Sequence, residues 1–270
     1  MNITENQIKS IMLTPSAQHV SLERLDGMLH PSMGPRHKPM AFAWLVRHVL
    51  AQLAFAFPGV EPHVEMVVNN LKDGHHLLCI IRFGETGPDG LRRVIALRSS
   101  DNQDFGVLVA AMAEIKMCCN GQVWGGGLMY VKKNTLYNRP QFEGVVSQTL
   151  EAYESGYARL VDDKRLLERK PVTEIRGAEL LGIAEYDGII KPQQASIMRK
   201  EWRSPGSSLP KLTDGSQDPR VSLWQEAWQE RNFHTLDMAI TEGLKKGGIA
   251  DRIERHSEAH DFIMDAALAA

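Results

Sequence analysis

Leu91-Arg92-Arg93-Val94-Ile95-Ala96-Leu97-Arg98-Ser99-Ser100-Asp101 opens the stretch, residues 91–135, that decides the fold of this chain. A second apolar run extends from Phe105 to Met112, and a third, Leu128-Met129-Tyr130-Val131, follows a triplet of glycines. These runs are short, rich in β-branched and aromatic residues, and bounded by Gly, Asp and Asn, which is typical of strands. Each run ends in a polar or basic cluster. We therefore expect a sheet whose strand ends carry the functional groups.

The sequence before this stretch extends the same sheet. Residues His63–Val68 alternate between polar and apolar, Asn70–Gly74 supply turn residues, and His76–Phe83 reads as the partner strand of a hairpin. We count five or six strands between His63 and Lys133, mostly in sequential hairpins. Gly125-Gly126-Gly127 predicts a turn rather than a phosphate-binding loop. The pattern indicates an α+β protein with an antiparallel or mixed sheet.

Helices are expected both before and after the sheet along the chain. A short helix is predicted over Thr4–Ile11, and a second from Pro39 to about Phe55 is apolar on most faces, which favours burial under the sheet. Helical spacing after Pro140 predicts a helical C-terminal part: Phe142–Leu167, Thr173 to Asp187-Gly188, Pro192–Trp202, Ser222–Lys246 and Ile249–Leu268. Residues 203–220 are rich in Ser, Pro, Gly and Asp, which predicts a long mobile loop. We expect 1–140 and 141–270 to pack as one compact unit.

Composition sets the broad class. The net charge is −2, but residues 72–139 carry nine Lys/Arg against six Asp/Glu, while the C-terminal part is acidic. The three cysteines give no even-numbered framework, and the N-terminus lacks a signal-peptide pattern. No apolar run reaches the about 18 residues that span a bilayer. These features predict a soluble protein of the cytoplasm, with oligomeric state left open.

No strong catalytic or cofactor motif is present, so we expect neither an enzyme nor a bound cofactor or metal. His256 and His260 lie one helical turn apart, but Glu258 is misplaced for a zincin motif, and an exposed polar helix face is the better interpretation. The adjacent pairs His75-His76 and Cys118-Cys119 lack ligand spacing.

Basic and aromatic residues interleave around the predicted sheet. Cations attract a phosphate backbone, and aromatic rings stack on unpaired bases. This pattern suits single-stranded nucleic acid, whereas a solvated sheet face with aromatics turned inward is the structural alternative. The candidate binding residues are Lys72, Arg82, Arg92, Arg93, Arg98, Trp124, Tyr130, Lys132, Lys133, Tyr137 and Arg139.

Several short motifs resemble the phage/plasmid-like proteins that were long filed as a domain of unknown function. That family shows Ser-His-Asp, Val-Cys-Asp-Asn and Lys/Arg-His-Thr at strand ends, and later Ser-Leu-Trp and Asn-Ala-x-Thr-Glu-x-Leu-Lys. The matching residues here are Ser99-Ser100-Asp101, Met117-Cys118-Cys119-Asn120, Lys133-Asn134-Thr135, Ser222-Leu223-Trp224 and Met238-Ala239-Ile240-Thr241-Glu242-Gly243-Leu244-Lys245. Ser100, Cys119, Asn134 and Met238 replace the family's His, Asp, His and Asn.

The chain is most similar to a divergent branch of that family, carried by lytic podoviruses that package a virion RNA polymerase. The resemblance implies a single-stranded-DNA-binding cofactor of the phage RNA polymerase, acting in the host cytoplasm, with a fold unlike the OB-fold. Two other classes stay open. A metal-dependent DNA-processing enzyme would need Asp101, Asp104 and Glu114 to converge, and an interaction protein would contact a host factor through its acidic C-terminal helices.

Overall fold

The computed structural model describes residues 17–30, 34–35, 37–69, 75–87, 89–115, 123–131, 133–207, 220–244 and 249–270. The chain divides into two compact units. Unit 1 comprises residues 1–114 and 125–158, and unit 2 comprises residues 115–124 and 159–270. The predicted helix over Thr4–Ile11, residues 116–122 with their two cysteines, and most of the predicted loop 203–220 lie outside the described residues.

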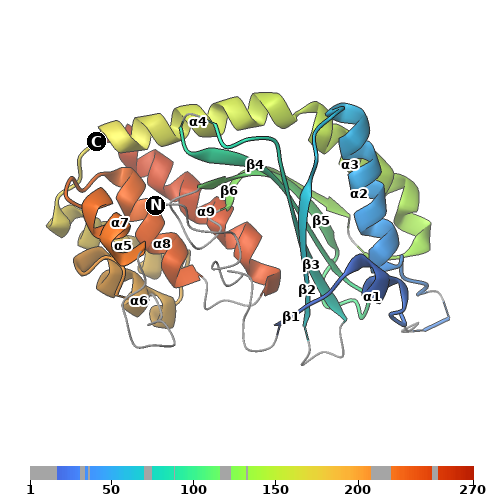
Figure 1. The fold of residues 1–270 in the computed structure, drawn as a ribbon. Helices are drawn as coiled ribbons and strands as arrows, with labels where there is room; N and C mark the ends of the chain where they lie inside the picture. Colours follow the sequence, from blue (N-terminus) through green and yellow to red (C-terminus); the bar gives the residue numbers. More distant parts are fainter. Residues whose placement is uncertain are drawn as a thin grey trace, which may run out of the picture. The chain divides into compact units, whose positions relative to one another are not determined.

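The described residues confirm the α+β prediction. One sheet contains six strands in chain order: β1 (Ala17–His19), β2 (His63–Asn69), β3 (His76–Phe83), β4 (Leu91–Ser100), β5 (Val107–Ile115) and β6 (Val123–Val131) (Figure 1). The predicted hairpin of β2 and β3 is present, with Met66 opposite Cys79, and β3 pairs antiparallel with β4. The link from Ser100 to Val107 is too short for the crossover of about a dozen residues that parallel strands need.

Helices α2 (Phe42–Ala56) and α3 (Arg139–Glu151) cover one face of the sheet, and α1 (Leu22–Asp26) lies near the start of α2 (Figure 1). Because side chains alternate along a strand, odd-numbered residues of β3 and β4 such as Cys79 and Leu97 enter this core. Even-numbered residues such as Arg82 and Arg98 lie on the other face. The sheet therefore separates an apolar face under α2 from a face that carries charges.

Tyr153 fixes the start of α4 (Tyr153–Arg169) on the sheet. Its hydroxyl accepts a hydrogen bond from the Val94 N–H at 2.7 Å and donates to the Met112 carbonyl at 2.6 Å. Burial raises the pKa of this hydroxyl. The tie of Tyr153 to two strands explains why α3 and α4 are separate helices, where a single helix over Phe142–Leu167 was predicted.

Unit 2 is helical: beyond the second part of α4 it contains α5 (Glu174–Tyr186), α6 (Pro192–Arg203), α7 (Arg220–Ala227), α8 (Phe233–Leu244) and α9 (Ile249–Leu268). Helix α8 is buried along its length and packs between α6 and α9. The expected Thr173 cap is present, since its hydroxyl accepts from the Arg176 N–H. In the described part of the chain, no helix has the length and apolar character needed to cross a membrane.

Three further element predictions were wrong in detail. Gly125-Gly126-Gly127 lies inside β6 rather than in a turn, because glycine also fits an extended strand. The helix predicted over Ser222–Lys246 is two helices, α7 and α8, since the Asn232 side chain accepts from the Thr235 N–H at 2.9 Å and starts a new helix. The helix predicted from Pro39 begins at Phe42. Its surface is not buried on every side, because Phe55 is 87% exposed.

Candidate nucleic-acid interface

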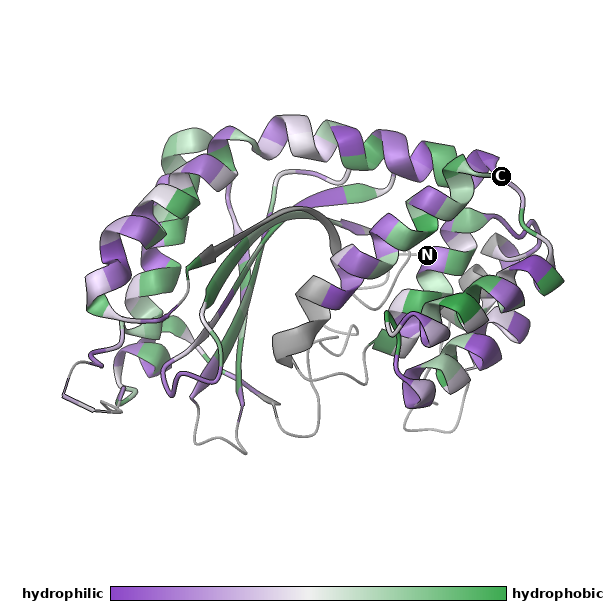
Figure 2. Cartoon of the chain, turned by 180° about the vertical axis from the view of Figure 1, so that it is seen from behind, coloured by the Kyte–Doolittle hydropathy of each residue, from purple (hydrophilic) through white to green (hydrophobic). Residues whose placement is uncertain are grey.

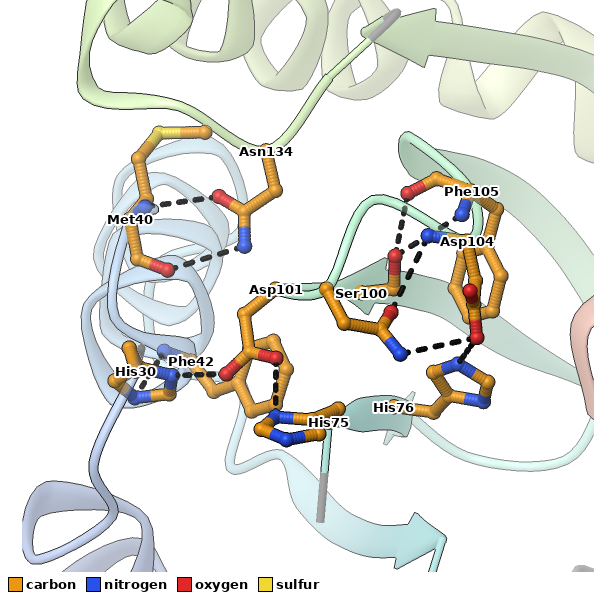
Figure 3. A network of polar contacts seen from close by, with 11 residues as sticks. His30, Met40, Phe42, His75, His76, Ser100, Asp101, Asp104, Phe105 and Asn134 are labelled. Atoms are coloured by element: carbon orange, nitrogen blue, oxygen red, sulfur yellow. Dashed lines mark hydrogen bonds and ion pairs between the residues drawn. The ribbon is translucent and has the colours of Figure 1, made fainter. Parts of the chain in front are cut away.

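Asp101, directly after β4, is fully buried between two histidines (Figure 3). Its carboxylate oxygens lie 2.8 Å from His30 Nδ1 and 2.7 Å from His75 Nδ1. The Phe42 N–H donates to His30 Nε2, so the proton of His30 is on Nδ1, where it bonds to Asp101. Phe42 opens α2, whose N-cap residue Ala41 has no side-chain cap. His30 therefore replaces the missing cap and ties the start of α2 to the end of β4.

Asn134 makes a second tie to the start of α2 (Figure 3). Its side chain is 1% exposed, accepts from the Met40 N–H at 2.9 Å and donates to the Met40 carbonyl at 3.2 Å. The Leu136 N–H donates to the Lys38 carbonyl at 2.7 Å. Lys38 and Met40, just before α2, are thus both bonded to residues that follow β6, and the Asp101 and Asn134 motifs both lie at the start of α2.

The η3 turn (Leu136–Asn138) presents a set of exposed side chains beside this anchor. Tyr137 is 92% exposed and Leu136 is 52% exposed. The η3 patch, as we call it, consists of Lys38, Lys133, Leu136, Tyr137 and Arg139, all exposed. Asn138 Nδ2 donates to the Lys133 carbonyl at 2.9 Å, which closes the turn. A large ring held in solvent by a braced turn is an unusual use of tyrosine.

Arg139 is held over an aromatic ring. Its guanidinium lies 4.4 Å from the centre of the half-buried Trp44 ring, and its Nε donates to Glu143 at 3.0 Å. Trp44 in turn stacks on His48 with ring centres 5.3 Å apart. Burial lowers the pKa of His48, and the charge of Glu143 opposes that effect. The Trp44 ring therefore orients Arg139, but the Glu143 carboxylate would compete with any other anion for its guanidinium.

The predicted cations on the sheet are placed differently from those of the η3 patch. Arg82 is 9% exposed and bonds to Glu114 at 2.7 and 2.9 Å and to Glu65 at 2.9 Å. Burial disfavours its charge, but these two carboxylates raise the pKa of Arg82 on balance. Arg93 forms a two-bond pair with Glu154, at 3.1 Å for each bond.

Arg98 is 4% exposed, with its guanidinium 4.7 Å from the centre of the Phe105 ring, and Arg92 is half-buried. Arg82, Arg93 and Arg98 thus already make internal contacts, and Arg92 is half-buried, so these four arginines are weaker candidates for a phosphate than the exposed cations. Lys72 and Lys132 lie outside the described residues, as do the side chains of Trp124 and Tyr130, whose backbones belong to β6. Of the predicted residues, the structure brings Lys133, Tyr137 and Arg139 together in the open.

The carboxylates required for the enzyme alternative have separate partners. Asp101 bonds to His30 and His75, Asp104 bonds to His76 at 2.7 Å, and Glu114 bonds to Arg82. Within the described ranges, no group of three or more His, Cys, Asp or Glu side chains is arranged to hold a metal ion.

The interpretation of His256 and His260 as an exposed polar face was wrong. His256 is 8% exposed and His260 is 2% exposed. His260 lies 3.6 Å from Asp163 of α4 and 3.5 Å from Asp237 of α8. Burial disfavours the imidazolium, yet the two carboxylates raise the pKa of His260 to about 9. Its burial is explained by partners on other helices, which local spacing does not reveal.

Sequence reasoning missed the contributions of His30, Lys38 and Trp44. Each precedes or begins α2, far in sequence from the motifs they support. The only sequence feature that points to these roles is the position of His30 and Lys38 on either side of the Pro-rich segment before α2.

Comparison with protein-family models, curated proteins and solved structures finds no match to this chain.

Proposed function

We propose that this chain is a single-stranded-DNA-binding protein that contacts the strand through the η3 patch. One observation carries the proposal: Tyr137, 92% exposed, lies in a braced turn between the exposed cations Lys133 and Arg139. An exposed ring offers a face on which an unpaired base stacks, and the flanking cations attract the adjoining phosphates. Duplex bases are already stacked on each other, so the arrangement favours single strands.

The biological role follows from the resemblance to the podoviral branch of the phage/plasmid-like proteins. We propose that the protein serves a bacteriophage as a cofactor of the phage RNA polymerase in the host cytoplasm. A strand held on the η3 patch would be kept from reannealing and so remain open to the polymerase. Adding the protein to the purified phage polymerase should raise transcription from duplex templates, and no effect on any template would contradict this role.

The test of DNA binding compares two equally exposed tyrosines. Tyr186, 91% exposed on α5, is a matched control for Tyr137. Tyr137→Ala should weaken binding of a single-stranded oligonucleotide by about 1–3 kcal/mol, while Tyr186→Ala leaves it unchanged. Fluorescence anisotropy at one fixed salt concentration measures both. Equal effects of the two variants, or equal loss on duplex DNA, would reject stacking on Tyr137.

The same samples separate the other two classes of function. Binding without cleavage in the presence of Mg²⁺ supports the proposal. Magnesium-dependent cleavage of the oligonucleotide would favour a DNA-processing enzyme. Absence of any binding would favour an interaction protein.

A further inference from the structure

The C-terminal end of α4 forms the wall of a pocket in unit 2. The pocket has a volume of about 460 Å³ and is lined by Asp162, Arg165, Leu166, Arg169 and Lys170. Hydrophilic and hydrophobic residues are interspersed along α4 (Figure 2). Three cations thus surround the pocket with a single acid and a single aliphatic side chain.

Two of these cations face no acidic side chain among the residues that the structure describes. Arg165 Nη1 lies 3.6 Å from Asp162, but within the described part of the chain the side chains of Arg169 and Lys170 have no acidic partner. Arg165 and Arg169 are one helical turn apart, where like charges disfavour the helix by a few tenths of a kcal/mol. A helix C-terminus favours cations, which offsets that repulsion in the absence of a ligand. An anion in the pocket would remove it.

A second pocket in the same unit shows that this charge pattern is local. It is lined by Thr173, Glu174, Ile175, Ala178, Glu179 and Arg203 and has a volume of about 690 Å³. Here two acids face one cation, and Glu174 also lies 3.3 Å from Arg231. The larger pocket is therefore unsuited to an anion, whereas the α4 pocket carries a net excess of cations.

We propose that the α4 pocket binds one phosphate-bearing nucleotide unit of a single-stranded nucleic acid, an inference that rests on the proposed function and adds a second contact to it. Its volume lies within the about 300–1,000 Å³ usual for ligand sites. Arg169 and Lys170 would contact phosphate oxygens, and the half-buried Leu166 would face the sugar or base.

The experiment compares two pairs of substitutions that remove the same charge. The double substitution Arg169→Ala with Lys170→Ala removes two of the three cationic side chains that line the α4 pocket. Lys200→Ala with Arg203→Ala removes two exposed cations from the last turn of α6 and serves as the control. Anisotropy of a labelled oligonucleotide is measured for both pairs and for the unsubstituted protein between 50 and 200 mM salt. Circular dichroism checks the fold, and Arg169→Gln alone replaces the pair if it does not fold.

Loss of the one phosphate contact in the pocket should reduce the salt slope by about 0.7, so the unsubstituted protein loses about 2.6-fold more affinity across this range than the pocket variant. The control should keep the original slope. Equal slopes for the two variants would overturn the proposal. Inorganic phosphate at constant ionic strength should reduce the difference between the unsubstituted protein and the pocket variant, because it competes with the strand phosphate for the same pocket.

The outcomes also separate this inference from the proposed function. Weakening by Tyr137→Ala without any effect of the pocket pair would remove the pocket and keep the η3 patch. The reverse result would keep the pocket and remove the η3 patch. An unsubstituted protein that binds no oligonucleotide would overturn both.

Discussion

Asp101 is a buried carboxylate whose two oxygens bond to different histidines. Asparagine in its place offers one acceptor oxygen and would turn its NH₂ group toward an imidazole N–H. Asp101→Asn should therefore cost about 2–3 kcal/mol of stability, because one buried donor loses its charged partner. Asp104, 40% exposed and paired with His76, provides the control, and Asp104→Asn should cost less than about 1 kcal/mol. Urea unfolding followed by circular dichroism measures both, and equal losses would contradict the role given to Asp101.

Glu143 competes with DNA for Arg139 if the proposed function is correct. The ion pair is exposed, so its free energy is about 0.2–1 kcal/mol. Glu143→Gln should then tighten binding of a single-stranded oligonucleotide by up to about fivefold, since Arg139 stays over Trp44 but loses the carboxylate. Glu151→Gln makes the same charge change at the end of α3, at an exposed position. A similar gain with Glu151→Gln would show that net charge alone is responsible.

At the scale of elements, packing in unit 2 depends on glycine. A Cβ on Gly177 of α5 would lie 2.4 Å from the Trp202 ring of α6. The ring cannot move freely, because Trp202 is fully buried and its Nε1 donates to the Glu174 carbonyl at 2.9 Å. Gly177→Ala should therefore destabilise unit 2 by about 1–3 kcal/mol, as overpacking does elsewhere.

Gly182 in the same helix is the natural control. No atom lies within 4 Å of a Cβ built there, so Gly182→Ala should stabilise the helix by up to about 1 kcal/mol through helix propensity. Thermal unfolding of the two variants should shift in opposite directions. Shifts of the same sign would show that α5 and α6 are not packed as described.

For the whole molecule, two buried histidines of unit 2 predict the pH range of stability. The pKa of His260 is raised to about 9, so its contribution is complete below the ordinary value near 6.5 and is lost as pH rises through about 9. Burial lowers the pKa of His234 to about 3, helped by the charges of Lys164 and His260. The unfolded chain therefore binds a proton that folded His234 does not, and stability falls as pH drops from about 6.5 toward 3.

Denaturant unfolding between pH 4 and pH 10 should show maximal stability near neutral pH. In His260→Phe, the free energy of unfolding should no longer fall between neutral pH and about pH 9, because the variant has no imidazolium that could lose its proton. An alkaline decline equal to that of the unsubstituted protein would show that His260 does not carry a proton between its two carboxylates.

The sequence by itself determined where most of the strands and helices lie. Period-two runs predicted the hairpin of β2 and β3 in its observed place, and Thr173, Asp187 and Gly188 marked the ends of α5. These signals are local: strand alternation, caps and turn residues act within a few residues of each other. The missed breaks, at Ala152 and before Asn232, lie where a side chain bonds outside the predicted helix or caps a new one.

Only the tertiary structure decided which charged residues are available. Arg82 and Arg139 look alike in the sequence, but the sheet register brings Glu65 and Glu114 to Arg82, whereas Arg139 stays at the surface over Trp44. Local spacing predicts an exposed His260, but the fold buries it beside Asp163 and Asp237. The physical reason is that the cost of burying a charge is set by partners distant in the chain. The local sequence pattern therefore predicts the position of a cation on its helix or strand. The tertiary contacts decide whether that cation is free to bind a ligand.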